Sequence, residues 1–497
     1  MQIEKKGSCY IRLPFFVQEN AHKPKSVFPR CADRCIQKMD VLQYNAERKQ
    51  ENRIHMTKDL TEGAITPQLI KFTIPLVFGN IFQLMYNSVD SIIVGRLVGK
   101  EALAAVGTSN PLMTLAILFV NGMCMGAAVL MGTQYGAGKK EVLRRQISTT
   151  MLAGIVFSLA VSLLFVIFAA PLLELLQVQQ EVLPLAVHYL RIIFIGFLFT
   201  FIYNFFACTL RALGDSTTPL YFLMVSSVLN IVGDLFFVAV LKLGSAGCAV
   251  STVLSEALCC LFCVIYIWRK VPELNLGKDW LIFDAGLLKQ TILYGWAGAM
   301  QQGTVQLGKI GVQAIANTMG VTVMAAYTII NRIDDFACMP EQNIGHAMTS
   351  FMAQNRGAGK KERVKKGFFG GMMIEAFYGA CISLICFFFA KPIVSLFVKD
   401  AEVIREGVTY LRLMSVMYLL PAATNGIQGF FRGIGDLKVT LLSSMMNMGM
   451  RVLAAFVLVA VFQMQVETFP YACLAGWIAM LIVELPLLMK NYRNMKA

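Results

Sequence analysis

Long apolar runs separated by short polar breaks occupy most of the chain from Thr66 onward. Several runs exceed the ~20 residues with which an α-helix crosses a bilayer, and the ~10-residue alternation of a membrane β-barrel is not found. The pattern therefore predicts an all-α membrane protein with twelve transmembrane helices in two sets of six. The first set is expected at 67–96, 106–133, 147–169, 186–210, 217–241 and 246–268. The second set is expected at 288–318, 322–353, 367–390, 407–431, 438–462 and 468–489.

Pro75, Pro340 and Pro421 fall inside these predicted helices. Proline removes a backbone hydrogen bond and bends a helix. Helices in lipid tolerate the bend where neighbouring groups satisfy the freed carbonyl, so we expect bends at these three positions.

Composition supports a membrane protein. Only 15% of the 497 residues are charged and 57% are hydrophobic, whereas a soluble domain carries about 25% charged residues. The net charge of +14 suggests nucleic acid at first, but the basic residues lie in short loops between apolar runs. Charges in such loops orient a membrane protein, so we expect the lipid bilayer and no nucleic acid as a partner. Most of the thirteen cysteines lie in apolar segments and are expected to be free thiols.

The basic loops alternate along the predicted bundle. The loop after the second helix carries Lys139, Lys140, Arg144 and Arg145, and the loop after the eighth helix carries a similar group at 360–366. Loops on the opposite side are short or mixed in charge. By the positive-inside rule, both termini are expected in the cytoplasm.

The chain contains an internal repeat. The hexapeptide Gly136–Glu141 recurs unchanged as Gly357–Glu362, and other pairs, such as Pro171 with Pro392, keep the same offset of 221 residues. A constant offset indicates duplication of one unit. Because each unit has an even number of helices, both copies run the same way across the membrane, as in transporters whose substrate site lies between the halves.

The repeat predicts two six-helix lobes, at 56–268 and 287–497, joined by a basic cytoplasmic linker at 269–286. Residues 1–55 differ from both lobes, with eleven Lys and Arg against six Asp and Glu and no helical period. We interpret this stretch as a disordered basic extension or a wrongly assigned start before Met56. A functional basic tail is the alternative.

Two repeated turns, Arg211–Asp215 and Arg432–Asp436, lie at predicted cytoplasmic helix ends. In each turn, the glycine suits a helix stop, the aspartate an N-cap and the arginine the membrane interface. We interpret both turns as structural.

Charged residues inside a membrane helix are costly and are candidates for function. In the first half these are Asp90 and Asp234, with Asn230 one helical turn before Asp234. A rise of ~1.5 Å per residue puts both acids in the outer half of the bilayer, so a shared pocket is expected. Carboxylate and amide oxygens suit a hard monovalent cation, and carboxylates removed from water also hold a proton more tightly. The equivalent second-half positions are Gly311, Arg451 and Ala455, so the fold itself does not require the acids.

The second half has buried charges of its own, at Lys309, Asp334, Asp335 and Glu341. Lys309 and Asp334 are expected at similar depths. A neutralising ion pair and a substrate-binding role both stay open for this group.

Five stretches together resemble the multidrug and toxic compound extrusion (MATE) family, from about Met56 to the C-terminus. They are Pro75–Gly95, Gln134–Gly138, Arg211–Asp215, Asn230–Asp234 and Gln354–Gly359. The resemblance implies export of organic, often cationic, compounds in exchange for protons or sodium by alternating access of two lobes.

The resemblance also implies a coupling site. Asp90, Asn230 and Asp234 match the first-lobe cation site of the DinF-like bacterial branch, and Asn204 matches a further asparagine of that site. The NorM-like branch uses a glutamate in the seventh helix, where this chain has only glutamines, such as Gln301. We expect H⁺ or Na⁺ at the first-lobe residues, and no other metal or cofactor.

We therefore interpret the chain as a bacterial inner-membrane antiporter that acts as a monomer on small organic substrates. A lipid-linked or metabolite exporter on the same fold is the alternative. A membrane enzyme is disfavoured because the four histidines are scattered and no nucleophile motif occurs. A channel is disfavoured because no filter-like segment interrupts the predicted helices.

Overall fold

The computed structural model describes residues 59–271 and 281–494. The chain divides into two units, Met1–Ile54 and His55–Ala497, and the described residues all belong to the second. The predicted extension at 1–55 lies outside the described residues, and so do residues 272–280, half of the predicted linker at 269–286.

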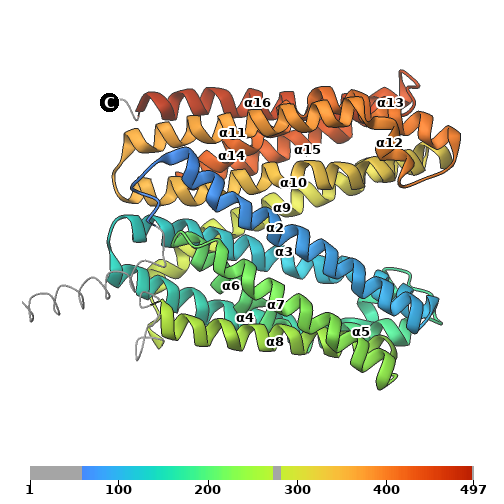
Figure 1. Ribbon diagram of the computed structural model, residues 1–497, viewed down its shortest axis with the longest axis horizontal. Helices are drawn as coiled ribbons and strands as arrows, with labels where there is room; N and C mark the ends of the chain where they lie inside the picture. Colours follow the sequence, from blue (N-terminus) through green and yellow to red (C-terminus); the bar gives the residue numbers. More distant parts are fainter. Residues whose placement is uncertain (1–58, 272–280, 495–497) are drawn as a thin grey trace, which may run out of the picture. The chain divides into compact units, whose positions relative to one another are not determined.

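All twelve predicted apolar runs are helical, and the described ranges contain no strand (Figure 1). The first set comprises α2 (Ile65–Leu97), α3 (Lys100–Gly136), α4 (Lys140–Leu175), α5 (Leu183–Ile195) with α6 (Phe197–Ala212), α7 (Thr217–Asp234) with the π-helix η1 (Leu235–Val240), and α8 (Gly244–Lys270). The second comprises α9 (Ala285–Asn317), α10 (Val321–Gly357), α11 (Lys361–Phe388), the short α12 (Ala390–Ser395), α13 (Ala401–Met417) with α14 (Leu419–Gly433), α15 (Leu437–Ala460) and α16 (Thr468–Asn494). The predicted twelve-helix fold is confirmed.

Eight described helices are long and apolar enough to cross a membrane, and the bent pair α5 and α6 makes a ninth. The other spans, α9, α10 and α13 with α14, are more polar. Of these, α10 packs against α2, α3, α11, α13 and α14. Its polar side chains therefore face protein as well as lipid, so α10 can be less apolar than a helix surrounded by lipid.

Two predicted helices are each broken in the middle. The α5–α6 pair bends by 48° at Gly196, where a methyl group would lie only 2.5 Å from the Val253 side chain of α8. The break between α13 and α14 lies just before Pro421, and Pro421 is in the first turn of α14. Proline cannot donate to the carbonyl four residues earlier, which explains why α13 ends there. Pro75 and Pro340 lie inside continuous helices.

The same hydrogen bond supports both breaks. Ser162 Oγ donates to the carbonyl oxygen of Phe194 at 2.5 Å, and Ser383 Oγ donates to that of Ser415 at 2.5 Å. Each pair is the other shifted by the 221-residue offset. A side-chain hydroxyl thus satisfies a carbonyl next to the break in each copy.

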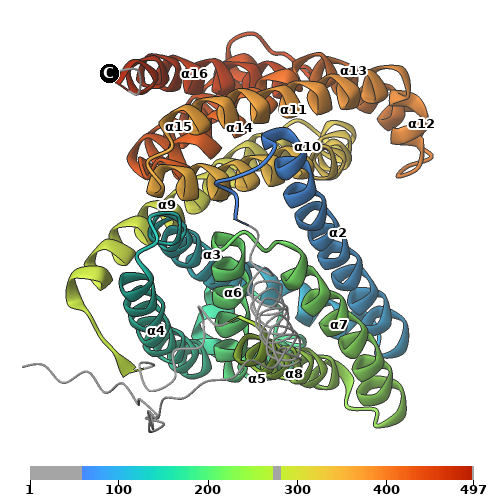
Figure 2. The same ribbon diagram turned by 60° about the vertical axis from the view of Figure 1, so that its left-hand side comes forward.

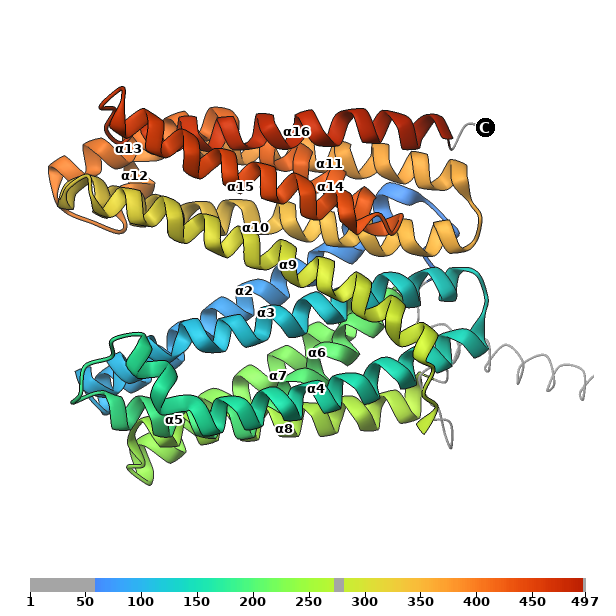
Figure 3. The ribbon, with the colours of Figure 1, turned by 180° about the vertical axis from the view of Figure 1, so that it is seen from behind.

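Each set of helices has its own apolar core, and these sets are called the first and second lobes below. The first-lobe core joins α3, α4, α5, α6 and α8, and the second-lobe core joins α9 to α13 with α16. However, α2 and α9 run diagonally between the lobes (Figures 2 and 3). Leu69, Phe72 and Leu76 in the first half of α2 pack on the second lobe, whereas Ile93 and Val94 pack on the first.

Small residues bring α3 and α9 together between the lobes. A methyl group on Gly122 would overlap the backbone of Ala299, and one on Gly126 would overlap the backbone at Gly295. Both helices place these residues four positions apart, the small-xxx-small pattern of close helix packing in membranes. This contact involves the second half of α3 and the first half of α9. Both halves lie toward the end of the bundle at which α3 and α10 end and the basic turns follow. This end is called the basic end below.

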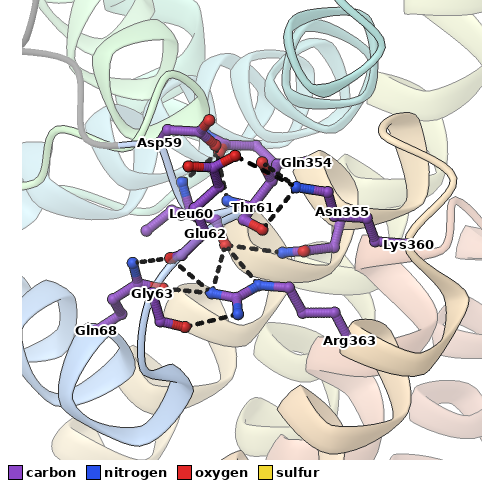
Figure 4. A network of polar contacts seen from close by, with 10 residues as sticks. All are labelled: Asp59, Leu60, Thr61, Glu62, Gly63, Gln68, Gln354, Asn355, Lys360 and Arg363. Carbon is purple, nitrogen blue, oxygen red and sulfur yellow. Dashed lines mark hydrogen bonds and ion pairs between the residues drawn. The ribbon is translucent and has the colours of Figure 1, made fainter.

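The chain before α2 bridges the lobes at the basic end (Figure 4). Gln354 of α10 accepts a hydrogen bond from the Leu60 amide (3.1 Å) and donates one to the Ala212 carbonyl of α6 (2.7 Å). Arg363 of α11 donates to the carbonyls of Leu60, Glu62 and Gly63 and to Gln68 Oε1, at 2.7 to 3.3 Å. The segment Asp59–Gly63, called the entry segment below, is therefore fixed to the second lobe.

Candidate functional site

The two first-lobe acids meet, as predicted. One oxygen each of Asp90 (α2) and Asp234 (α7) and the sulfur of Cys248 (α8) lie within 4.8 Å of one another. The Cys248 thiol donates a hydrogen bond to Asp90 Oδ1. Asp234 is fully buried, and both its oxygens lack a hydrogen-bond partner among the described residues.

Local helix geometry places Asp234 against Cys248. A methyl group on Gly233 would overlap the Ser251 hydroxyl, and one on Gly247 would lie 3.0 Å from the Phe237 carbonyl oxygen. The two glycines therefore allow α7 and α8 to pack closely. Asp234 is also the last α-helical residue before the π-helix η1, and π-helical turns often occur at functional sites.

The two predicted asparagines lie apart from the acid pair. Asn204 and Asn230 line a cavity of about 300 Å³ inside the first lobe, called the first-lobe cavity below, which neither Asp90 nor Asp234 lines. Asn230 Nδ2 donates to Thr252 Oγ1 at 3.2 Å, and its Oδ1 is buried without a partner among the described residues. The four predicted residues thus form an acid pair and a neighbouring amide pair.

The sequence analysis missed Glu256, which lines the first-lobe cavity. Its Oε2 accepts a hydrogen bond from Thr200 Oγ1 at 2.5 Å. The sequence did contain a signal for Glu256 as a candidate site residue, because it is an acid inside the predicted apolar run 246–268. Cys248 was also missed, and its sequence context gives no sign that it contacts an acid.

The second-lobe candidates do not gather into one site. Lys309 Nζ lies 3.0 Å from Asp335 Oδ1, and the two side chains are 46% and 53% exposed. The predicted depths had indicated Asp334 as the partner of Lys309. Asp334 instead accepts a hydrogen bond from Tyr418 Oη at 2.5 Å. Glu341, two turns further along α10, is fully buried, and its oxygens have no partner among the described residues.

A second cavity of about 280 Å³ lies between the lobes and is called the central cavity below. Its walls come from α2, α3, α6 and α7 of the first half and from α9 and α10 of the second. Asn80 Nδ2 of α2 donates to Asn343 Oδ1 of α10 across it at 3.3 Å. The cavity also shares Asn80, Asn121 and Asn204 with the first-lobe cavity, so the two spaces adjoin.

Arg211 lies in the last turn of α6, at the helix end where it was expected, and also lines the central cavity. The remainder of its turn behaves as predicted. Gly214 has φ +90° at the helix stop, and Asp215 Oδ1 accepts from the amides of Thr217 and Thr218 at 3.0 Å. In the twin turn, Gly435 has φ +80° but Asp436 makes no side-chain cap.

Comparisons with known proteins show the family of the chain. The family model described as MatE matches residues 75–236 and 299–457, more than half of the chain. The probable multidrug resistance protein YoeA of Bacillus subtilis (strain 168) is 30% identical over 413 residues, which cover 81% of this chain and 89% of YoeA. The probable multidrug resistance protein YpnP of the same strain is 27% identical, with 78% and 87% covered.

Solved structures share the fold. A structure described as MATE in the bent conformation matches with a TM-score of 0.81 at 22% identity, covering 89% of this chain and 98% of the other. A structure described as the outward-facing conformation of a multidrug resistance MATE family transporter matches with a TM-score of 0.79 at 22% identity, with 88% and 98% covered.

Proposed function

Because the chain belongs to the MATE family of multi-pass membrane transporters, we propose that it exports small organic molecules in exchange for protons. The relatives named probable multidrug resistance proteins support an exporter. The observation that carries the proposal is the buried pair Asp90 and Asp234 in the first lobe. Its equivalents in the repeat are Gly311 and Ala455, so the pair serves a purpose other than folding.

The donor set of this site favours a proton over sodium. Hard cations take several oxygen ligands, and a thiol suits softer metals. Here the third ligand atom beside Asp90 and Asp234 is the Cys248 sulfur, and Asn230 lines the adjoining cavity instead. A proton needs no such ligand shell, and sharing one relieves the repulsion between two adjacent carboxylates.

The proposal of alternating access is based on α2, which packs on both lobes. The first half of α2 packs on the second lobe, while Asp90 lies in its other half. Loss of the shared proton would leave two charged carboxylates together, and α2 and α7 would move apart to relieve their repulsion. That movement changes how the lobes pack, so protonation and substrate binding each favour one access state.

We further propose a bacterial inner membrane with the basic end in the cytoplasm. With that orientation, the close contacts between α3 and α9 support the proposal that the cytoplasmic side is shut, as in an outward-facing state. A lipid-linked exporter needs a wide cavity, and the central cavity of about 280 Å³ does not favour it. We expect the protein to act as a monomer.

The test is transport by purified protein in proteoliposomes under an imposed pH or sodium gradient. Ethidium and the three naphthalene compounds described below serve as probes. We expect the pH gradient to drive export and Asp234→Asn to abolish it. Glu141→Gln is the matched control, since it removes an exposed acid that is paired with Arg145 at the basic end.

Transport driven by sodium alone would overturn the choice of ion. Undiminished transport in Asp234→Asn would remove the acid pair from coupling, and no transport of any probe under either gradient would sink the proposal as a whole.

A further inference from the structure

Arg211 brings an uncompensated positive charge to the central cavity. Its side chain lines the cavity, and its Nε is buried without a hydrogen-bond partner among the described residues. The nearest acid in sequence, Asp215, already accepts two backbone amides at the start of α7. A charge inside a membrane bundle is stable when a partner neutralises it, and within the described chain Arg211 has none.

The internal repeat provides a comparison, because the equivalent arginine of the second lobe has different surroundings. Arg432, the twin of Arg211, is 6% exposed and donates a hydrogen bond to Thr349 Oγ1 at 3.3 Å, and the buried acids Glu484 and Glu375 lie in its surroundings. The equivalents of these two acids in the first lobe are Cys263 and Gly154. Among the described residues, the first lobe therefore keeps the arginine but lacks the hydrogen bond and the two nearby acids of its twin.

The surroundings of Arg211 add no negative charge. Among the described residues that line the central cavity, none is Asp or Glu, and the other titratable side chain of basic type is His346. His346 faces the positive charges of both Arg211 and Arg432. Amide side chains complete the polar part of the wall, among them Asn121, Gln302 and Asn343.

Apolar side chains line the same cavity as this polar region. Among them are Phe72, Leu76, Leu220 and Leu223. A ligand that fits both regions has an apolar body and one negatively charged group. The guanidinium fork and the amide donors match a carboxylate, because charge-assisted hydrogen bonds to a planar anion are the strongest available to arginine.

We propose that the central cavity binds small organic carboxylates, with the carboxylate at Arg211 and the apolar body against α2 and α7. This inference rests on the proposed transport function and specifies its substrate class. It assigns Arg211 as the specificity residue. The two adjoining cavities then carry opposite charges. The central cavity has the basic Arg211, and the first-lobe cavity has the acidic Glu256.

Three compounds that differ only in charge test the proposal. Naphthoate is an anion, naphthamide is neutral, and naphthylmethylamine is a cation at neutral pH. Binding of each to the full chain in lipid nanodiscs is measured by calorimetry with no gradient present. We expect naphthoate to bind about tenfold or more tightly than the other two.

Two variants locate the preference. Arg211→Gln should weaken naphthoate binding by about tenfold or more and leave naphthamide binding unchanged, which also shows that the variant is folded. Arg145→Gln is the matched control, because it removes an exposed arginine paired with Glu141 at the basic end. We expect it to leave all three affinities unchanged.

Three results would overturn the anion site. They are equal or weaker binding of naphthoate than of naphthylmethylamine by the wild type, no binding of naphthoate at all, or an unchanged preference in Arg211→Gln. The wild-type ranking needs no variant, so the proposal stays testable if Arg211→Gln does not fold.

Transport of the same compounds separates this inference from the proposed function. If naphthoate binds as expected but no gradient moves any probe, the anion site is supported and the antiport proposal falls. If a gradient drives naphthylmethylamine but not naphthoate, the antiport proposal stands and the anion site falls.

Discussion

Gly136 and Gly357, the two copies of one repeat position, each lie against the other copy's helix at the basic end. A methyl group on Gly136 would overlap the carbonyl of Gln354, and one on Gly357 would overlap the carbonyl of Thr133. Thr133 and Gln354 are themselves separated by the repeat offset of 221. The ends of α3 and α10 therefore meet in a contact that each repeat makes with the other, and only glycine allows their approach.

This contact predicts that Gly136→Val and Gly357→Val each prevent closure of the basic end. The added side chain overlaps backbone, which cannot move aside without separating α3 from α10. We expect transport to fall strongly and Cys208, which lines the central cavity, to react faster with a maleimide, as located by mass spectrometry of peptides. Gly107→Val is the control, since nothing lies within 4 Å of a methyl group at that position of α3. Unchanged Cys208 labelling in both glycine variants would contradict the contact's role in closure.

Arg363 predicts a second way to open the basic end. Its guanidinium holds the entry segment through three carbonyls and Gln68, and a lysine cannot reproduce that fork. Arg363→Lys should therefore loosen the entry segment although the charge is kept, and we expect faster proteolysis next to α2 and faster Cys208 labelling. Lys366→Gln is the control, because Lys366 is an exposed basic residue of the same helix. If Arg363→Lys behaves like wild type in both measurements, charge alone holds the segment.

The sequence predicted the helices because a membrane span is encoded locally by a long apolar run. It also identified Asp90 and Asp234 as candidates for one pocket, since a fixed rise per residue places both acids in the outer half of the bilayer. The same count could not separate Asp334 from Asp335. Neighbouring residues differ little in depth, but their side chains point about 100° apart around the helix, and direction decides which one reaches Lys309.

Features that depend on packing between distant segments were not predictable from local pattern. At the break in the α5–α6 pair, Gly196 packs against the Val253 side chain of α8, a contact between segments far apart in the sequence. Arg211 and Arg432 share the motif Arg-x-x-Gly-Asp, yet their surroundings differ because the first lobe has Gly154 and Cys263 where the second has Glu375 and Glu484. Glu256 is a different case, because an acid inside an apolar run was visible in the sequence.

The ion pair between Lys309 and Asp335 predicts a small contribution to stability. Half-exposed pairs contribute about 0–1 kcal/mol, so Lys309→Ala and Asp335→Ala should each lower the free energy of unfolding by less than about 1 kcal/mol. Tyr418→Phe should cost more, about 1.5–3 kcal/mol, because it removes the phenol that donates to Asp334 in a less exposed site. Denaturation in detergent measures all three. A loss of transport in Lys309→Ala without loss of stability would instead assign Lys309 to substrate binding.

Arg432 predicts a marked loss of stability in the second lobe. Its side chain is buried and donates to Thr349 Oγ1 at 3.3 Å, with the buried acids Glu484 and Glu375 nearby. Replacing the guanidinium removes a buried hydrogen bond made by a charged group, at a cost of about 1.5–3 kcal/mol. Arg432→Gln should therefore unfold at lower denaturant concentration than wild type.

The double variant Arg432→Gln with Glu484→Gln should recover part of the lost stability, because it also replaces a buried carboxyl group whose oxygens have no hydrogen-bond partner among the described residues. Arg211→Gln provides the matched comparison, since the same substitution at the twin position breaks no side-chain hydrogen bond among the described residues and should change the free energy of unfolding little. Equal destabilisation by Arg211→Gln and Arg432→Gln would show that both arginines are structural, and would remove the contrast between the lobes on which the anion site depends.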